Sequence, residues 1–386
     1  MSSAHPFPAR RAHAVTAIMS LAALSFAVLA LAACGGSDDE PAPPTYAQRC
    51  GLAKADEGVL ELPAPTGSHC VGKASFQVTD LGRLETLTAD ETDQRELSVK
   101  IWYPALADAG APRADYLPGP IFDVMKTVQQ LPAGSRQPAT SAKPDLRMAA
   151  QARHPVLLFS PGYGGNVEMY STLLEDAASH GYVVVGIDHP YISGVTVLAN
   201  GSIAPFGDPQ STHAALSAAI MVEDQRGMVD WLERQNALGS GHLLSGHLDL
   251  SRIGAFGHSI GGSAALNASR ADPRIKAAID MDGRVFGDLA EPWPKPLMLM
   301  LAANHPSSDE TIDAVLRHAA GPAVRSVLAA AGHNDFSDLK LLAKHYFPDD
   351  QPPDLEAQGL GSIRAEEAVQ FMRIKTMSFF GTYLQP

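Results

Sequence analysis

One stretch near the middle of the 386-residue chain constrains its fold more than any other. It runs from Arg252 to Gly262 and reads as a short apolar strand, a turn with the pattern G-x-S-x-G, and the start of a helix of small residues. Glycines two positions before and after Ser259 suit a tight strand-to-helix turn, where neighbouring backbone leaves no room for side chains. A turn of this kind lifts the serine hydroxyl above the edge of a sheet and predicts a nucleophile at that position.

The segments around this turn alternate between predicted strands and predicted helices. Predicted strands occupy residues 156–160, 182–187, 253–256, 275–281, 297–302 and 324–330, and the first of them is a continuous apolar run. Helical patterns occupy about 170–179, 215–235 and 362–384. Earlier in the chain, residues 74–79 and 97–103 read as edge strands of an antiparallel meander. This order predicts an α/β protein with a mostly parallel central sheet, helices on both faces and an antiparallel N-terminal edge.

The sequence does not define the role of the segment that follows the two early strands. Residues 105–150 form a predicted insertion rich in Pro, Ala and Gly, with a short helix predicted over 121–128. It could cap a site or form an inert surface loop, and the sequence favours neither alternative. Asp188 and His189, which follow the strand over 182–187, are interpreted as residues that fix a loop rather than as substrate contacts.

The predicted nucleophile requires two partners. A serine hydroxyl is a poor nucleophile at neutral pH, so Ser259 needs a base within hydrogen-bond reach and an acid that orients this base. With an elbow serine, the acid is expected next in the chain and the histidine last. His333 directly follows the last predicted strand, which favours it as the base over His305 and His318.

The acid is less well defined by the sequence. Asp282 follows the strand predicted over 275–281, and Asp309 follows the strand predicted over 297–302, so position alone favours them equally. Asp280 is a third candidate, but it lies inside its strand. Because the carboxyl ends of parallel strands meet at one edge of a sheet, an acid in either loop can meet Ser259 and the base.

A second glycine-rich loop, Pro161 to Gly165, follows the apolar run over 156–160. Hydrolases with an elbow serine take one oxyanion-stabilising N–H group from such a loop and another from the residue after the serine. We therefore predict that the backbone N–H groups of Tyr163 and Ile260 form an oxyanion hole for the negative charge that develops on a substrate.

The composition excludes some classes of partner. The formal net charge is −13 and Lys and Arg form no cluster, which argues against nucleic acid. With 45% apolar and 18% charged residues, the chain has the composition of an ordinary globular protein. It has no H-E-x-x-H metal motif, and we expect neither a metal ion nor a cofactor.

The N-terminus predicts export. Residues 1–33 read as a signal peptide, in which Arg10 and Arg11 precede an apolar stretch. Leu31-Ala32-Ala33-Cys34 resembles the lipobox of bacterial lipoproteins, which implies cleavage before Cys34, lipidation of that cysteine and a membrane anchor. The alternative is a plain secretory signal cleaved near Ala33. The expected location is the outer membrane or periplasm as a lipoprotein, or otherwise outside the cell.

Export also bears on the remaining cysteines. Residues 34–58 read as a flexible tether and residues 59–386 as the catalytic domain. Cys50 and Cys70 are the two cysteines other than Cys34. Because exported proteins commonly form disulfides, we predict that these two cysteines are joined.

Six short motifs occur in a fixed order along the chain. They are LPAPTG (62–67), WYP (102–104), FSPGYG (159–164), ASHGYVV (178–184), GHSIGG (257–262) and HNDF (333–336). Together they resemble the plasma-type (group VII) platelet-activating factor acetylhydrolases and their bacterial relatives, which have the α/β-hydrolase fold. The resemblance covers roughly residues 60–383.

This resemblance favours one of the two candidate acids over the other. The family places its acid 23 residues beyond the serine, which implies Asp282 rather than Asp309. Its histidine begins a His-x-x-Phe run, as His333 does here. Its oxyanion loop reads His-Gly-Leu-Gly, where this chain has Pro161 and Tyr163; a backbone donor tolerates the change, but the larger side chain leaves the size of the acyl pocket open.

The sequence thus predicts a metal-independent serine ester hydrolase with Ser259, Asp282 and His333 as its catalytic residues. The resemblance implies short acyl groups, including sn-2 acetyl groups of phospholipids. The first alternative is a carboxylesterase of broad specificity or a polyester hydrolase. The second is a catalytically dead surface lipoprotein that binds a ligand.

Overall fold

The computed structural model describes residues 43–128, 131–149, 153–208, 210–347 and 354–385. The predicted signal peptide, Cys34 and the start of the predicted tether lie outside these residues. The described chain forms one unit that begins at Pro44. Within it, no helix combines the length and the apolar character needed to cross a membrane.

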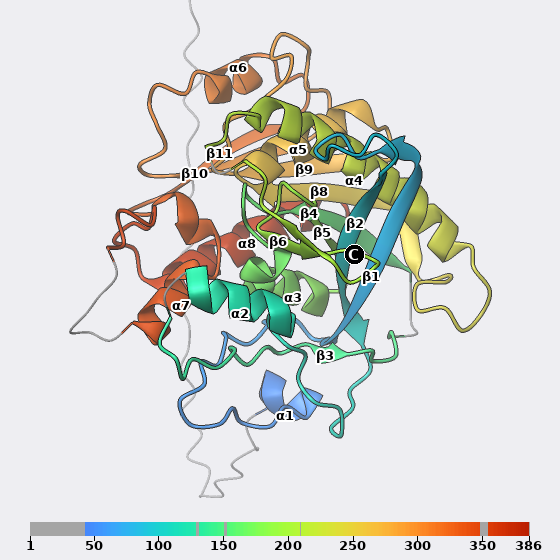
Figure 1. The fold of residues 1–386 in the computed structure, drawn as a ribbon, viewed down its shortest axis with the longest axis vertical. Coiled ribbons are helices and arrows are strands. Elements are labelled where there is room, and N and C mark those ends of the chain that lie inside the picture. Colours follow the sequence, from blue (N-terminus) through green and yellow to red (C-terminus); the bar gives the residue numbers. More distant parts are fainter. Residues whose placement is uncertain (1–42, 129–130, 150–152, 209, 348–353, 386) are drawn as a thin grey trace, which may run out of the picture. The chain divides into compact units, whose positions relative to one another are not determined.

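The centre of this unit is a nine-stranded sheet with the order β11-β10-β9-β8-β4-β5-β2-β1-β3 (Figure 1). The strands are β1 (Cys70–Leu84), β2 (Gln94–Ala105), β3 (Lys143–Pro144), β4 (His154–Ser160), β5 (Val183–Asp188), β8 (Leu248–His258), β9 (Ile275–Met281), β10 (Leu297–Ala302) and β11 (Ala323–Leu328). The run from β11 to β5 is parallel, whereas β2 pairs antiparallel with both β5 and β1. A separate hairpin joins β6 (Val195–Val197) and β7 (Ile203–Pro205).

Helices cover both faces of the sheet (Figure 1). They are α1 (Tyr46–Cys50), α2 (Gly119–Val128), α3 (Ser171–Ser179), α4 (Ala214–Asn236), α5 (Ile260–Ala271), α6 (Thr311–Arg317), α7 (Leu339–Tyr346) and α8 (Ala365–Tyr383), with 3₁₀ turns η1 (Val167–Tyr170) and η2 (His333–Phe336). Along β4, Val156 and Leu158 pack in the cluster that contains α4 and α5, whereas Leu157 and Phe159 pack in the cluster that contains α3 and α8. Because both faces of β4 are buried, its sequence is a continuous apolar run rather than an alternating one.

The insertion over residues 105–150 belongs to the folded core. It contributes β3, which pairs parallel with β1 and extends the sheet edge. It also contributes α2, and Tyr116 and Ile121 are buried in the cluster that contains α3 and α8. The alternative of an inert surface loop is therefore wrong.

The predicted tether is too long at its C-terminal end. Instead of remaining extended to residue 58, the chain forms α1, which begins with a capping box between Thr45 and Gln48 and ends at Gly51 in a left-handed conformation. Cys50 and Cys70 form a disulfide, with 5.5 Å between their Cα atoms. This bond ties α1 to the start of β1, so the folded unit begins well before residue 59.

Candidate active site

Ser259 lies at a strained turn between β8 and α5. Its backbone angles are φ 55° and ψ −125°, which a non-glycine residue adopts only when its surroundings force it. Two glycines make the turn possible: a Cβ atom on Gly257 would lie 2.4 Å from the Gly261 backbone, and one on Gly261 would lie 2.2 Å from the carbonyl oxygen of Ser160. The elbow therefore packs directly against the end of β4, where the second glycine-rich loop begins.

Asp282 follows β9, the strand next to β8. Its φ of 58° is again in the left-handed region, and its N–H donates to the carbonyl of Met300, 2.7 Å away on β10. The carboxylate is 2% exposed and its Oδ1 accepts the N–H of Ala302 at 2.7 Å. Burial opposes ionisation, but the bonds from His333 and Ala302 outweigh it and lower the pKa of Asp282.

His333 reaches Asp282 from η2, after β11. Its Nδ1 lies 2.7 Å from Oδ2 of Asp282, and its side chain is 42% exposed. Within the described residues, no hydrogen bond joins His333 to the hydroxyl of Ser259. Hydrogen bonds of this kind are often long before a substrate is present. The bond to Asp282 is the one that orients the ring nitrogens of His333 in the described structure.

Among the described residues, none of the competing side chains bonds Ser259 or His333, and His305 instead bonds Asp282, at 2.9 Å between Nδ1 and Oδ1. Asp309 contacts His305 instead of His333, at 3.3 Å between Oδ2 and Nε2. His318 bonds the carbonyl of Ala314 at the end of α6. Asp280 lies under the elbow, where burial raises the pKa of its carboxyl well above the usual range.

The two predicted oxyanion donors lie just beyond the ends of two adjacent strands. Tyr163 follows β4 and Ile260 begins α5, directly after β8, and β4 and β8 pair in parallel up to Ser160 and Gly257. Among the described residues, neither N–H group has an acceptor. Free N–H groups at a helix N-terminus and in a neighbouring glycine-rich loop are suited to stabilising an oxyanion.

A chain of hydrogen bonds connects the predicted oxyanion loop (Pro161 to Gly165), the elbow and the start of η2 at His333. The Gly162 N–H donates to the Tyr170 hydroxyl at 3.1 Å, and this hydroxyl lies 2.8 Å from Nδ1 of His258. Nε2 of His258 lies 2.9 Å from the carbonyl oxygen of His333. A carbonyl only accepts, so Nε2 carries the proton and Nδ1 accepts the Tyr170 O–H.

His258 is neutral in this chain of bonds. Burial, followed by the nearby His333, lowers the pKa of His258 to about 3. The sequence contained a hint, since His258 lies within the elbow motif, but Tyr170 has no sequence signal that connects it to Gly162 or to the elbow.

The side chain of Tyr163 also has defined partners. Its hydroxyl lies 2.8 Å from the Asp208 carboxylate and 3.1 Å from the Ser217 hydroxyl, and its ring packs edge-on against Phe206. These contacts fix the oxyanion loop to the segment after β7 and to the first turns of α4. The residue that differs most from the family pattern is thus part of the framework around the site.

His189 and Asp188 are buried in a polar network that reaches Ser160 at the end of β4. His189 bonds Asp224 through Nδ1 at 2.7 Å and the Ser160 hydroxyl through Nε2 at 3.0 Å. Arg95 in turn bonds Asp224 at 2.6 Å, and Asp188 pairs with buried Lys100. These contacts agree with the interpretation of both residues as structural.

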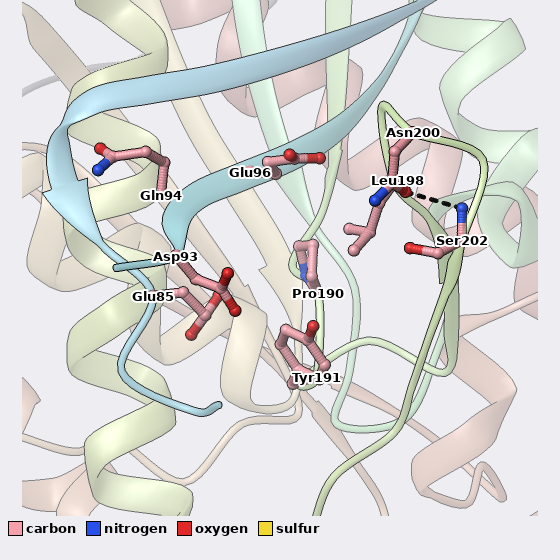
Figure 2. A pocket seen from close by; sticks show the side chains of 9 residues that line it. All are labelled: Glu85, Asp93, Gln94, Glu96, Pro190, Tyr191, Leu198, Asn200 and Ser202. Carbon is pink, nitrogen blue, oxygen red and sulfur yellow. Dashed lines mark hydrogen bonds between the residues drawn. The ribbon is translucent and has the colours of Figure 1, made fainter. Parts of the chain in front are cut away.

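A pocket of about 220 Å³ opens where β5 ends (Figure 2). Its lining is polar and includes Glu85, Asp93, Glu96 and Tyr191. The carboxylate of Glu85 is bonded to Arg95 at 2.5 Å. None of the three predicted catalytic side chains lines this pocket. Among the described residues, no group of His, Cys, Asp and Glu side chains is arranged to hold a metal ion.

The fold and the site together define an α/β-hydrolase. A solved ferulic acid esterase from Streptomyces cinnamoneus is 28% identical, with a TM-score of 0.72 over 84% of this chain and 93% of that one. A family model described as platelet-activating factor acetylhydrolase, isoform II, matches residues 55–200. The resemblance to the platelet-activating factor acetylhydrolases that the motifs indicated is thereby confirmed.

Two curated relatives illustrate the range of similar proteins. A probable 1-alkyl-2-acetylglycerophosphocholine esterase of Arthroderma benhamiae is 29% identical in an alignment of 251 residues that covers 58% of this chain and 59% of the relative. Cutinase 1 of Thermobifida cellulosilytica is 30% identical over 122 residues, 32% of this chain and 37% of the relative. The chain thus spans less than two thirds of the length of these relatives.

Proposed function

We propose that this protein is a metal-independent serine ester hydrolase. His333 accepts the Ser259 hydroxyl proton as the serine oxygen attacks the ester carbonyl. The C–O bond to the alcohol then breaks, and the alcohol leaves with that proton. Water attacks the acyl-enzyme in the second half of the cycle, with His333 again as the base, and the acid product and free Ser259 result. Asp282 holds His333 in the required tautomer and stabilises its imidazolium.

The observation that carries this proposal is the bond between Asp282 and His333 beside an elbow serine. The acid directly follows β9, the strand next to β8, and the Ser259 N–H donates to the carbonyl of Met281, directly before Asp282, at 2.8 Å. The free N–H groups of Tyr163 and Ile260 are suited to stabilise the tetrahedral oxyanion.

For the substrate we propose short acyl esters, among them sn-2 acetyl phospholipids. The name of the Arthroderma benhamiae relative and the family model support this class. The second candidate is a carboxylesterase of broad specificity or a polyester hydrolase, which the cutinase and the ferulic acid esterase favour. A ligand-binding lipoprotein without activity is the third, and the bonded Asp282–His333 pair argues against it.

We further propose that the enzyme is exported and anchored in a membrane through lipid on Cys34. The basic and apolar segments before Leu31-Ala32-Ala33-Cys34 support this proposal. Cells expressing the full chain in radiolabelled palmitate should incorporate label into the protein. Incorporation that persists in Cys34→Ala would contradict the anchor.

The substrate proposal is tested by hydrolysis assays in EDTA. An sn-2 acetyl ether phospholipid is compared with p-nitrophenyl acetate and butyrate, using wild type, Ser259→Ala and the exposed control Ser251→Ala. We expect turnover of all three esters by wild type and Ser251→Ala, and none by Ser259→Ala. Activity on the model esters alone would assign the enzyme to the broader esterases, and undiminished activity of Ser259→Ala would refute the mechanism.

A further inference from the structure

His305 lies between two carboxylates at the edge of the site. Its Nδ1 is 2.9 Å from Oδ1 of Asp282, and its Nε2 is 3.3 Å from Oδ2 of Asp309. Oδ2 of Asp282 is bonded to His333. A continuous row of charged or ionisable groups therefore runs from Asp309 through His305 and Asp282 to His333.

The chemistry of this row determines the protons on His305. An ionised carboxylate only accepts hydrogen bonds, and a neutral imidazole has a single N–H group. Neutral His305 would therefore present a bare nitrogen lone pair to one of its two carboxylates. Only the imidazolium, with a proton on each nitrogen, donates to both Asp282 and Asp309.

Both carboxylates are held in place by other groups. Oδ1 of Asp309 accepts the N–H of Thr311 at 2.9 Å and its hydroxyl at 2.6 Å. The Thr311 oxygen in turn accepts the N–H of Val285 at 3.0 Å, three residues beyond Asp282. The side chains of His305 and Asp309 are 11% and 6% exposed. Asp309 thus supports His305 from a fixed loop.

We propose that His305 is a positioning residue that carries two protons, bridges Asp282 and Asp309, and restrains the basicity of His333. This inference rests on the proposed function. His305 fixes Asp282 by bonding the oxygen that His333 does not use. Its positive charge lies on the far side of Asp282 and offsets part of the negative charge that stabilises protonated His333.

Four ionisable groups determine this balance. Asp282 and Asp309 contact His305 directly, and His333 lies beyond Asp282. Asp280 lies beneath on β9, where burial raises the pKa of its carboxyl well above the usual range. Without the charge of His305, Asp282 stabilises the His333 imidazolium more strongly. His333 then stays protonated, and inactive as a base, up to a higher pH.

The kinetic test compares His305→Gln with wild type across pH, with His318→Gln as the matched control. His318 is an exposed histidine at the end of α6 whose side chain bonds the backbone carbonyl of Ala314. We expect the acid limb of the kcat/KM profile to move up by roughly one pH unit in His305→Gln and to stay unchanged in His318→Gln. A uniform loss at every pH, with the limb in place, would show a merely structural role and overturn the proposal.

A second readout does not depend on turnover or on the stability of that variant. The 15N shifts of the ring nitrogens of His305 in wild type distinguish an imidazolium from a neutral ring. We expect both nitrogens to be protonated at pH 7, and one to lose its proton in Asp309→Asn. A neutral ring in wild type would overturn the inference, whereas wild type without esterase activity or Ser259 labelling would instead refute the proposed function.

Discussion

The hydroxyl of Tyr170 provides a stringent test of the hydrogen-bond chain beneath the oxyanion loop. Tyr170→Phe removes one oxygen without opening a cavity. Two buried groups lose their partner: the Gly162 N–H, which donates to this oxygen at 3.1 Å, and Nδ1 of His258, at 2.8 Å. Tyr170 is 4% exposed and His258 is 2% exposed, so water has little access to replace the hydroxyl.

The expected cost follows from these two losses. Leaving one buried donor or acceptor without a partner costs about 1–3 kcal/mol, so the two losses in Tyr170→Phe should lower the free energy of unfolding by about 2–6 kcal/mol. It should also lower kcat by about tenfold, because Gly162 precedes the predicted oxyanion donor Tyr163 and small displacements of such groups are costly.

The protein contains a matched control. Tyr182 is 1% exposed, and its hydroxyl has no hydrogen-bond partner in the described chain. Tyr182→Phe therefore removes the same atom without breaking a bond, and we expect unchanged or slightly higher stability. Urea unfolding followed by tryptophan fluorescence measures both variants. Equal losses in Tyr170→Phe and Tyr182→Phe would refute the reasoning.

Three further predictions follow from the site and the fold. Asp282→Asn should lower kcat by about 10³–10⁴-fold, whereas Asp309→Asn should cost less than about tenfold; equal losses would contradict the assignment. Burial lowers the pKa of His258 to about 3 in the folded protein, whereas the unfolded chain takes up this proton below about pH 6.5. The free energy of unfolding in urea should therefore fall as the pH is lowered from 6.5 to 3, by up to about 1.4 kcal/mol per pH unit. The fall should be less steep in His258→Asn. Replacing Cys50 and Cys70 by Ser should cost about 3 kcal/mol of stability with kcat unchanged, since the bond closes a loop at the start of β1; loss of kcat in folded protein would contradict this.

The elements around the site could be predicted because their sequences are locally consistent. The strands β4 and β10 are buried along their whole length, and β8 and β9 are buried over the apolar residues that lead to the site. Ser259 directly follows β8, and Asp282 directly follows β9. The elbow was recognisable since Gly257 and Gly261 are required by contacts that no larger residue can make.

Other features depend on contacts between distant segments and have no local signal. Position alone did not distinguish Asp282 from Asp309, because both follow parallel strands and only the path of the loop after β11 decides which of them His333 meets. His305 was recognised as a rival base, but its place between two carboxylates depends on the loops after β9 and β10 together.

The start of the folded unit was missed although a signal was present. Thr45 and Gln48 have the spacing of a capping box and Gly51 follows as a helix stop, so α1 was readable from the sequence. The composition of residues 35–41 is that of a linker, and that interpretation was extended too far along the chain.

The central claim is that Ser259 forms a covalent acyl-enzyme. Folded wild-type protein is treated with a fluorophosphonate, digested, and analysed by mass spectrometry for the modified residue. We predict one adduct per chain, on Ser259, and a greatly reduced rate of labelling in His333→Ala. An adduct on another residue, or no adduct on folded protein that hydrolyses p-nitrophenyl acetate, would contradict it.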